Sequence, residues 1–94
     1  MDLSIAYNKA TSMTEAFDLA KEQITPEYVA KFKVKSEISY ERDNGKMIAT
    51  GKGFTLTLNF SESECEVSLK LSLLLKPLRG KILEAVERKL QKHT

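Results

Sequence analysis

The chain has 94 residues, of which 30% are charged and 41% are hydrophobic. These proportions predict one ordinary globular domain over residues 1–94, and they exclude two independent cores or a disordered tail. Fifteen Lys and Arg against 13 Asp and Glu leave a net charge of +2, so we expect no dedicated nucleic-acid binder.

The first third of the chain predicts a strand followed by helical structure. Residues 2–8 alternate between polar and apolar side chains, which is typical of a half-buried strand. Between Ser12 and Phe32 the apolar residues recur at helical spacing. Ser12 and Glu15 form a capping-box pattern, in which each side chain bonds to a free amide of the first turn. Pro26 interrupts the helical pattern, so we expect one kinked helix or two helices.

Alternation returns at Lys33 and predicts four consecutive strands. The turns between them are indicated by Asn44-Gly45, which tolerates the positive φ of a tight hairpin, by the glycines of 51–53, and by polar residues 61–64. The last strand is predicted from Cys65 to Leu75, with Ser72 pointing outward. The apolar side of the last two strands, which we expect to face the core, comprises Phe54, Leu56, Leu58, Phe60, Cys65, Val67, Leu69, Leu71, Leu73 and Leu75.

The end of the chain predicts a long helix that completes the fold class. Lys76-Pro77 stops the last strand, and the helical spacing that follows predicts a helix from about Pro77 to Lys92. The order is therefore β-α(α)-β-β-β-β-α. We predict an α+β domain with a five-stranded antiparallel sheet and helices packed on one face. This order is similar to a shortened helix-grip domain, a likeness of fold that carries no function by itself.

Residues that could carry catalysis or bind a metal are scarce. Cys65 and His93 are the lone cysteine and histidine, and their spacing matches no ligand set, so Cys65 is interpreted as a small core residue. Glu62 and Glu64 fall in a predicted turn, where water screens both charges. We therefore expect no catalytic, cofactor-binding or metal-binding residue and no enzyme. With neither a membrane-spanning segment nor a signal peptide in view, we also expect a cytoplasmic protein.

Charge is distributed unevenly along the chain. From Lys76 onward six Lys and Arg face two Glu, so this region carries +4 and the remainder carries −2. A basic amphipathic helix can lie on an anionic lipid surface or against a groove. The simpler interpretation is that Lys and Arg favour helices and occupy the positions that face water.

The junction between the last strand and the last helix resembles a known bacterial family. Its pattern of a leucine pair, a proline and a basic Arg-Gly step is similar to that of the small polyhydroxyalkanoic acid system proteins, also called polyhydroxyalkanoate granule region proteins. The resemblance implies an association with storage-polymer metabolism or granules and implies no catalytic residue. The residues that carry it are Leu74, Leu75, Pro77, Arg79, Gly80 and Ile82, together with Gly51 and Gly53.

Three hypotheses follow from these observations. The first is a non-catalytic accessory protein whose binding surface meets polymer, lipid or a granule protein. The second is a carrier of a hydrophobic small molecule, with a cavity between the last helix and the sheet. The third is a homodimer formed sheet to sheet through Thr55, Thr57 and Leu74. The binding surface of the first hypothesis is formed by Leu74, Lys76, Pro77, Arg79 and Lys81.

Overall fold

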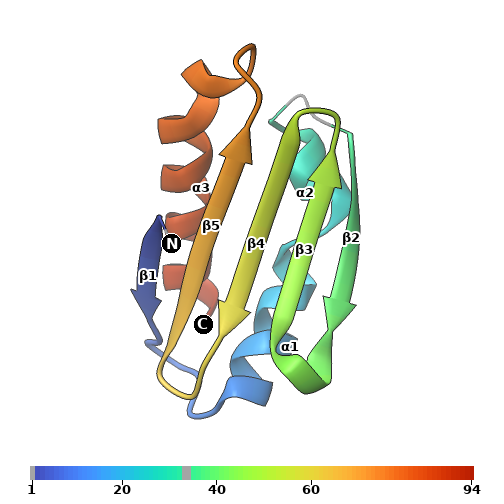
Figure 1. Ribbon diagram of the computed structural model, residues 1–94. Helices are drawn as coiled ribbons and strands as arrows, with labels where there is room; N and C mark the ends of the chain where they lie inside the picture. The colour runs from blue at the N-terminus through green and yellow to red at the C-terminus, as the bar shows by residue number, and fades with distance from the viewer. Residues whose placement is uncertain (1, 33–34) are drawn as a thin grey trace.

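A five-stranded antiparallel sheet and three α-helices form the structure, a computed structural model that describes residues 2–32 and 35–94 (Figure 1). The order of elements confirms the predicted α+β class, while the predicted strand residues Lys33 and Val34 lie outside the described residues. In chain order the elements are β1 (Leu3–Ala6), α1 (Met13–Gln23), α2 (Pro26–Ala30), β2 (Ser36–Glu41), β3 (Lys46–Gly51), β4 (Phe54–Phe60), β5 (Glu64–Leu71) and α3 (Arg79–His93).

The strands lie in the order β1-β5-β4-β3-β2, and every neighbouring pair is antiparallel. The first strand therefore pairs with the last, and α1 and α2 carry the chain from one edge of the sheet to the other. All three helices cover the same face (Figure 1). Helix α3 packs on β1 and β5, whereas α1 and α2 contact β4 and β2.

The two short helices begin where the sequence supplies capping side chains. The Ser12 hydroxyl accepts a hydrogen bond from the Glu15 amide at 3.2 Å. The Glu15 carboxylate accepts from the amide of Thr11 at 2.7 Å, one residue earlier than the capping-box pattern predicts. At α2 the Thr25 hydroxyl accepts from the Tyr28 amide at 3.1 Å, and a proline fills the first helical position. Local chemistry thus divides the predicted helical region into two helices.

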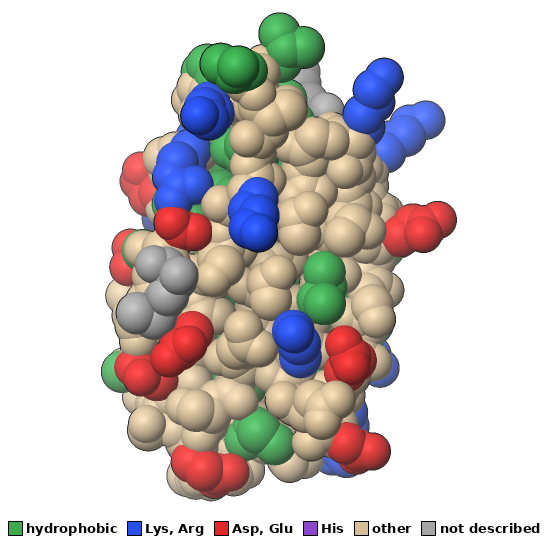
Figure 2. All heavy atoms as spheres, viewed as in Figure 1, with side chains coloured by type: hydrophobic (Ala, Val, Ile, Leu, Met, Phe, Trp, Pro, Cys, Tyr) green, Lys and Arg blue, Asp and Glu red, His purple; other side chains and the backbone are tan. Residues whose placement is uncertain are grey.

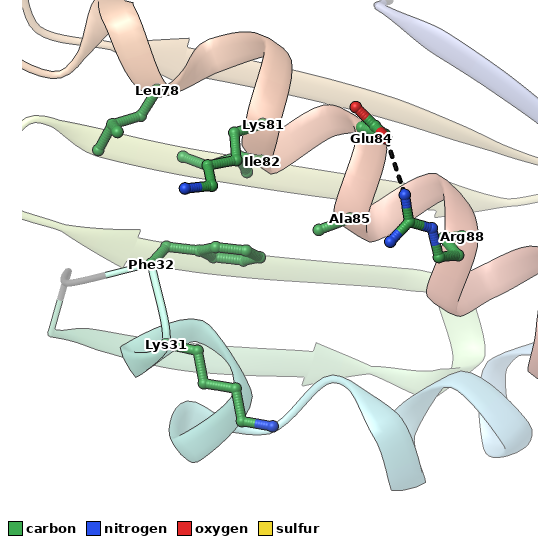
Figure 3. Close-up of a pocket in the computed structure, with 8 residues that line it drawn as sticks. All are labelled: Lys31, Phe32, Leu78, Lys81, Ile82, Glu84, Ala85 and Arg88. Carbon is green, nitrogen blue, oxygen red and sulfur yellow. Dashed lines mark hydrogen bonds and ion pairs between the residues drawn. The ribbon is translucent and has the colours of Figure 1, made fainter.

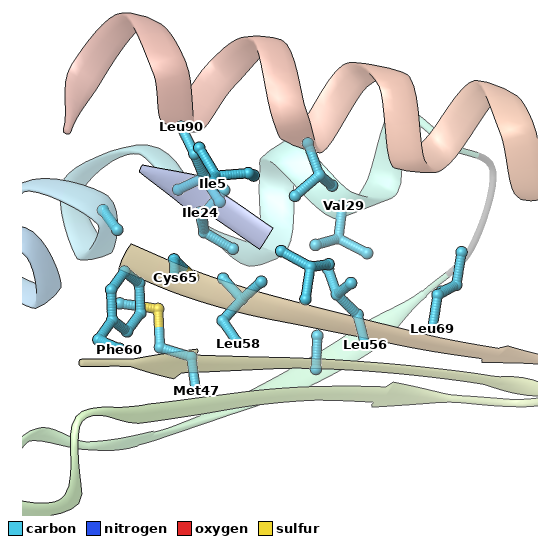
Figure 4. Packing of buried hydrophobic residues seen from close by; sticks show 14 of the residues in the cluster. Ile5, Ile24, Val29, Met47, Leu56, Leu58, Phe60, Cys65, Leu69 and Leu90 are labelled. Carbon is cyan, nitrogen blue, oxygen red and sulfur yellow. The ribbon is translucent and has the colours of Figure 1, made fainter. Parts of the chain in front are cut away.

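The core lies between the helices and the sheet, on the face that the alternation of the strands predicts (Figure 4). Phe17 of α1 packs edge-on against Phe60 of β4, with ring centroids 5.8 Å apart. The other face of the sheet has no helix over it and is lined by Ser, Thr, Asn and charged side chains (Figure 2). The fully buried large side chains are Phe17, Phe54, Ile5, Ile24, Met47, Leu56, Leu58, Ile82, Leu90, Val29, Val67 and Val86.

Strand β5 ends at Leu71, so the prediction of a strand to Leu75 is wrong. Leu71 pairs with Phe54, the first residue of β4, and the neighbouring strand offers no backbone partner beyond that point. The next amide, that of Ser72, donates to the Gly53 carbonyl at 2.8 Å, and the Leu75 amide then donates back to the Ser72 carbonyl at 3.0 Å. The chain therefore turns away from the sheet, with Ser72 exposed as predicted.

The residues after β5 lose the predicted alternation between inside and outside. Leu73, which was predicted to face the core, is 82% exposed, and its neighbour Leu74 is 91% exposed. Leu75 and Leu78 turn the opposite way and pack against the core, as does Leu71 at the end of the strand. The predicted row of leucines facing the core is therefore absent after Leu71. A turn takes its place, in which Leu73 and Leu74 face solvent while Leu75 and Leu78 pack against the core.

The turns that border these elements also differ in detail from the predictions. Between β2 and β3 the chain forms a 3-10 turn over Arg42–Asn44, and only Gly45 takes the left-handed conformation, with φ +60°. Between β3 and β4 Gly53 does the same, with φ +73°. A second 3-10 turn, Lys76–Leu78, precedes α3, so this helix begins at Arg79 rather than at the predicted Pro77.

Candidate functional site

The β5–α3 turn gives the molecule one distinctive end, which we call the leucine end. It is the end of the sheet at which Ser36, Gly51 and Phe54 align with Leu71, together with the exposed Leu73-Leu74 pair that follows. In Figure 2 hydrophobic side chains project at the top of the molecule, beyond the upper ends of the strands. A pair of adjacent leucines so exposed is unusual, because most large apolar side chains of this size are at least partly buried.

The exposed leucines are held by a well-bonded turn. Their neighbours Leu75 and Leu78 anchor the turn in the core. On the other side Ser72 lies so close to Gly53 that a Cβ atom on this glycine would be 2.6 Å from the Ser72 hydroxyl oxygen. The β3–β4 turn and the β5–α3 turn therefore fit closely together. This packing holds the backbone of the β5–α3 turn in place, so Leu73 and Leu74 face solvent from a fixed position.

Lysines surround the leucine end. Lys35 precedes β2, Lys52 lies in the turn between β3 and β4, and Lys76 follows the exposed leucines. Among the described residues no carboxylate lies within ion-pair distance of these three side chains. The turns at the opposite end of the strands instead carry acidic residues, and in Figure 2 acidic side chains gather toward the lower end of the view. The leucine end is thus both apolar and basic.

Arg79 was predicted to line the binding surface, but the structure gives its guanidinium group another role. It donates to the backbone carbonyl of Leu69 at 2.9 Å and forms an ion pair with the Asp2 carboxylate. The same carboxylate accepts from the Leu69 amide at 2.7 Å. That backbone hydrogen bond, followed by the charge of Arg79, lowers the pKa of Asp2. Arg79 therefore joins α3 to the first residues of the chain, and its charge is balanced there.

Lys81, the other predicted basic residue of α3, lines a separate surface cleft between α2 and α3. The cleft has a volume of about 490 Å³, and we call it the helix groove (Figure 3). Ile82, Val86 and Leu90 fill the space between α3 and the sheet, where a carrier cavity was predicted, so the cleft lies beside the core rather than inside it. The helix groove is lined by Lys31, Phe32, Leu78, Lys81, Ile82, Glu84, Ala85 and Arg88.

The five residues of the predicted binding surface thus fall into three places. Leu74, Lys76 and Pro77 are exposed together in the β5–α3 turn. Arg79 is bonded to the start of the chain and also borders a surface hollow with Leu71 and Lys76, whereas Lys81 belongs to the helix groove. The residues of the dimer hypothesis are also divided between two places. Thr55 and Thr57 lie on the uncovered face of the sheet, whereas Leu74 lies in the turn beyond it.

Sequence reasoning missed two residues that shape this region, Asp2 and Phe32. The carboxylate of Asp2 meets Arg79 across 77 positions of the chain, and nothing in the local pattern marks this pair. Phe32 lies near Leu78 and Ile82 across the helix groove, so its exposure is decided by how two distant helices pack. The helical spacing up to Phe32 predicts that this side chain packs against the core, which is confirmed, but it does not reveal the groove.

Cys65 and His93 lie apart, in the core and at the end of α3. Cys65 is fully buried in the core, and burial with the nearby charge of Glu66 raises the pKa of its thiol to about 12. Desolvation, followed by the charges of Lys89 and Lys92, lowers the pKa of His93. Within residues 2–32 and 35–94, no three His, Cys, Asp or Glu side chains are grouped as metal ligands. The interpretation of Cys65 as a core residue is confirmed.

Comparison with known proteins agrees with the resemblance seen in the sequence. No helix in the described part of the chain is both long and apolar enough to cross a membrane. Neither the curated proteins nor the solved structures contain a significant match to the chain. A model of the family described as "Putative polyhydroxyalkanoic acid system protein" matches residues 6–93. The chain therefore belongs to this family.

Proposed function

We propose that this member of the polyhydroxyalkanoic acid system family is a non-catalytic accessory protein that attaches to the surface of storage-polymer granules through its leucine end. The family places the chain in the context of a water-insoluble polyester. A protein that binds such a surface needs apolar side chains that remain exposed after the chain has folded. The leucine end supplies such side chains, and the family name alone does not identify them.

One observation carries the proposal, which is the exposure of Leu73 and Leu74 in a bonded turn. Burying a leucine side chain contributes about 1.5–3 kcal/mol, and the fold leaves this contribution almost unused at both positions. Contact with an apolar polymer would remove the two side chains from water. Because Leu75 and Leu78 already anchor the turn, attachment would require little ordering of the chain.

The lysines of the leucine end support attachment where the granule surface carries anions. Each Lys close to an anionic lipid surface contributes about 1 kcal/mol, and salt weakens this contribution. Lys52 and Lys76 lie at the same end as the leucines and are free of ion pairs with the described carboxylates. The apolar contact is therefore expected to persist in high salt, while the basic contribution declines.

A fluorescent fusion in a polymer-accumulating bacterium tests the proposal directly. The wild-type fusion is expected to concentrate at granule rims. The double variant Leu73→Ser with Leu74→Ser should become diffuse while its unfolding temperature stays unchanged. The matched control is Ile48→Ser, which removes a partly exposed apolar side chain from the uncovered sheet face, opposite Thr57. This control should remain at the rims.

Sedimentation of the purified protein with washed polymer particles gives the same test without other granule proteins. Wild type and Ile48→Ser should sediment with the particles, and the double leucine variant should remain in the supernatant. Rim localisation and sedimentation that survive the loss of both leucines would overturn the proposal. Loss of attachment in the Ile48 variant alone would move the contact to the uncovered face of the sheet.

A further inference from the structure

The helix groove has an apolar wall on each side. The ring of Phe32 extends beneath α3, opposite Ile82 and Ala85, and Leu78 lies at one end of the same row (Figure 3). From Leu78 to Ala85 helix geometry gives a length of about 10 Å. The cleft volume of about 490 Å³ falls within the range of roughly 300–1,000 Å³ that is typical of small-molecule sites. A slender alkyl chain fits this shape better than a bulky ring system.

The edges of the helix groove are positively charged. Arg88 donates to the Glu84 carboxylate at 2.7 Å, so these two charges balance each other. Lys31, directly after α2, and Lys81 of α3 both line the groove. Lys81 extends toward Phe32, whereas the exposed Lys31 side chain points away from α3 in Figure 3. No carboxylate among the described residues pairs with either. An occupant that satisfies both features must combine an apolar chain with a negative charge.

We propose that the helix groove binds the monomeric anion of a medium-chain carboxylic acid. The alkyl chain would lie between Phe32 and the Ile82–Ala85 wall. The carboxylate would be held by Lys81, and by Lys31 once its exposed side chain turns toward the groove. This site is distinct from the leucine end and goes beyond granule attachment, because it recognises a single dissolved molecule rather than an extended surface. Hydrocarbon burial supplies the affinity, and the two ammonium groups select the anion over a neutral chain.

The affinity should follow the length of the chain. Each methylene removed from water contributes about 0.8 kcal/mol, which tightens the dissociation constant up to fourfold per carbon. The anion should therefore bind in the order butyrate, hexanoate, octanoate, from weakest to tightest. The neutral octan-1-ol should bind at least fivefold more weakly than octanoate in low salt, because it forgoes both lysines, and added salt should narrow that difference.

A titration followed by amide NMR tests the site on the whole chain, with sodium octanoate kept below its micelle concentration. Saturable shifts are expected at Phe32, Ile82 and Ala85. Saturable shifts confined to the Leu73-Leu74 turn would overturn the proposal, because they would report adsorption at the leucine end. Shifts that appear on raising the protein concentration without octanoate would assign the groove to a second copy of the chain and also overturn it.

Two independent variants separate the apolar and charged parts of the site. Ala85→Phe fills the groove and should weaken octanoate binding at least tenfold, whereas the control Ala6→Leu adds an apolar side chain on the uncovered sheet face and should change nothing. The double variant Lys31→Glu with Lys81→Glu alters only exposed side chains and should abolish the preference for octanoate over octan-1-ol. If Ala85→Phe fails to fold, the lysine variant still decides the question.

The outcomes distinguish this site from granule attachment. The double variant Leu73→Ser with Leu74→Ser should bind octanoate as wild type does, even when it no longer reaches granules. Unchanged octanoate binding in the lysine variant, or equal binding of octanoate and octan-1-ol to wild type, would overturn the anion site. Neither result would bear on the leucine end, which shares no residue with this test.

Discussion

The two ends of the sheet close their turns in different ways. At the end opposite the leucine end, the hydroxyl of Tyr7 donates to the carbonyls of Ser61 and Glu64 at 2.7 and 2.8 Å, and these bonds hold the β4–β5 turn. The carbonyls of Ser61, Ser63 and Glu64 thus all accept hydrogen bonds from Tyr7. At the leucine end the turn is equally well bonded, yet Leu73 and Leu74 contact almost nothing.

This difference separates side chains that serve folding from side chains that are free for contacts outside the chain. In the β4–β5 turn, hydrogen bonds within the chain are a sufficient reason for the polar residues. An exposed leucine pair contributes little to folding, because its apolar surface stays in water. The contrast therefore agrees with the proposed contact at the leucine end. It also predicts that the two ends respond differently to substitution.

The largest contrast is expected from truncating apolar side chains at each end. Phe60→Ala should lower the free energy of unfolding by about 3–5 kcal/mol, because this ring is buried and packs edge-on against Phe17. Leu73→Ala with Leu74→Ala should change it by less than about 0.5 kcal/mol. Urea unfolding of each variant measures both values. A loss above about 1 kcal/mol in the leucine double variant would show that the turn contributes to the core.

A smaller contrast is expected from adding a methyl group to glycines at the two ends. Gly45→Ala should cost about 1–3 kcal/mol, because φ is +60° and the new Cβ would lie 2.9 Å from the Phe60 carbonyl oxygen. Gly80→Ala, at the leucine end, should stabilise the protein by up to about 1 kcal/mol, since this helical position has no atom within 4 Å of the new Cβ. Thermal unfolding compares them, and effects of the same sign would contradict this account.

The smallest contrast concerns the ion pair at each end. Asp2→Asn should destabilise the protein by about 1 kcal/mol at pH 7, because the carboxylate accepts from the Leu69 amide as well as from Arg79. Asp18→Asn should have no measurable effect, although two hydrogen bonds of 2.9 Å join Asp18 to Arg42, because water screens this exposed pair. Equal losses in the two variants would contradict the distinction.

The Asp2 pair also predicts a pH dependence. The pKa of Asp2 is lowered in the folded state, so the unfolded chain binds the proton first as the pH falls. The stabilisation is therefore complete above the ordinary Asp pKa of about 4 and is lost as the pH falls through the lowered value. Unfolding free energies measured from pH 6 to pH 2 should decline less steeply in Asp2→Asn than in wild type. Parallel curves would show that Asp2 contributes nothing.

Most of the fold can be predicted from local patterns of residues. Alternation over β4 and β5 identified the buried face from Phe54 to Leu69, because a strand that is covered on one side must alternate its side chains. Capping residues and Pro26 divided the helical region, since these signals act within one turn of chain. The family was also recognisable from the leucine, proline and glycine pattern after β5, which depends on sequence alone.

The positions of the candidate sites depend on contacts between distant parts of the chain. The alternating leucines after Leu71 look like more strand, but β4 begins at Phe54 and leaves them without a backbone partner, so two of them face solvent. Arg79 became a structural residue because folding brings Asp2 beside it. The helix groove likewise exists only because α3, on β1 and β5, and the end of α2, on β2, cover the same face of the sheet. Local periodicity reports which side chains avoid water, whereas partners distant in the chain decide which of them remain exposed.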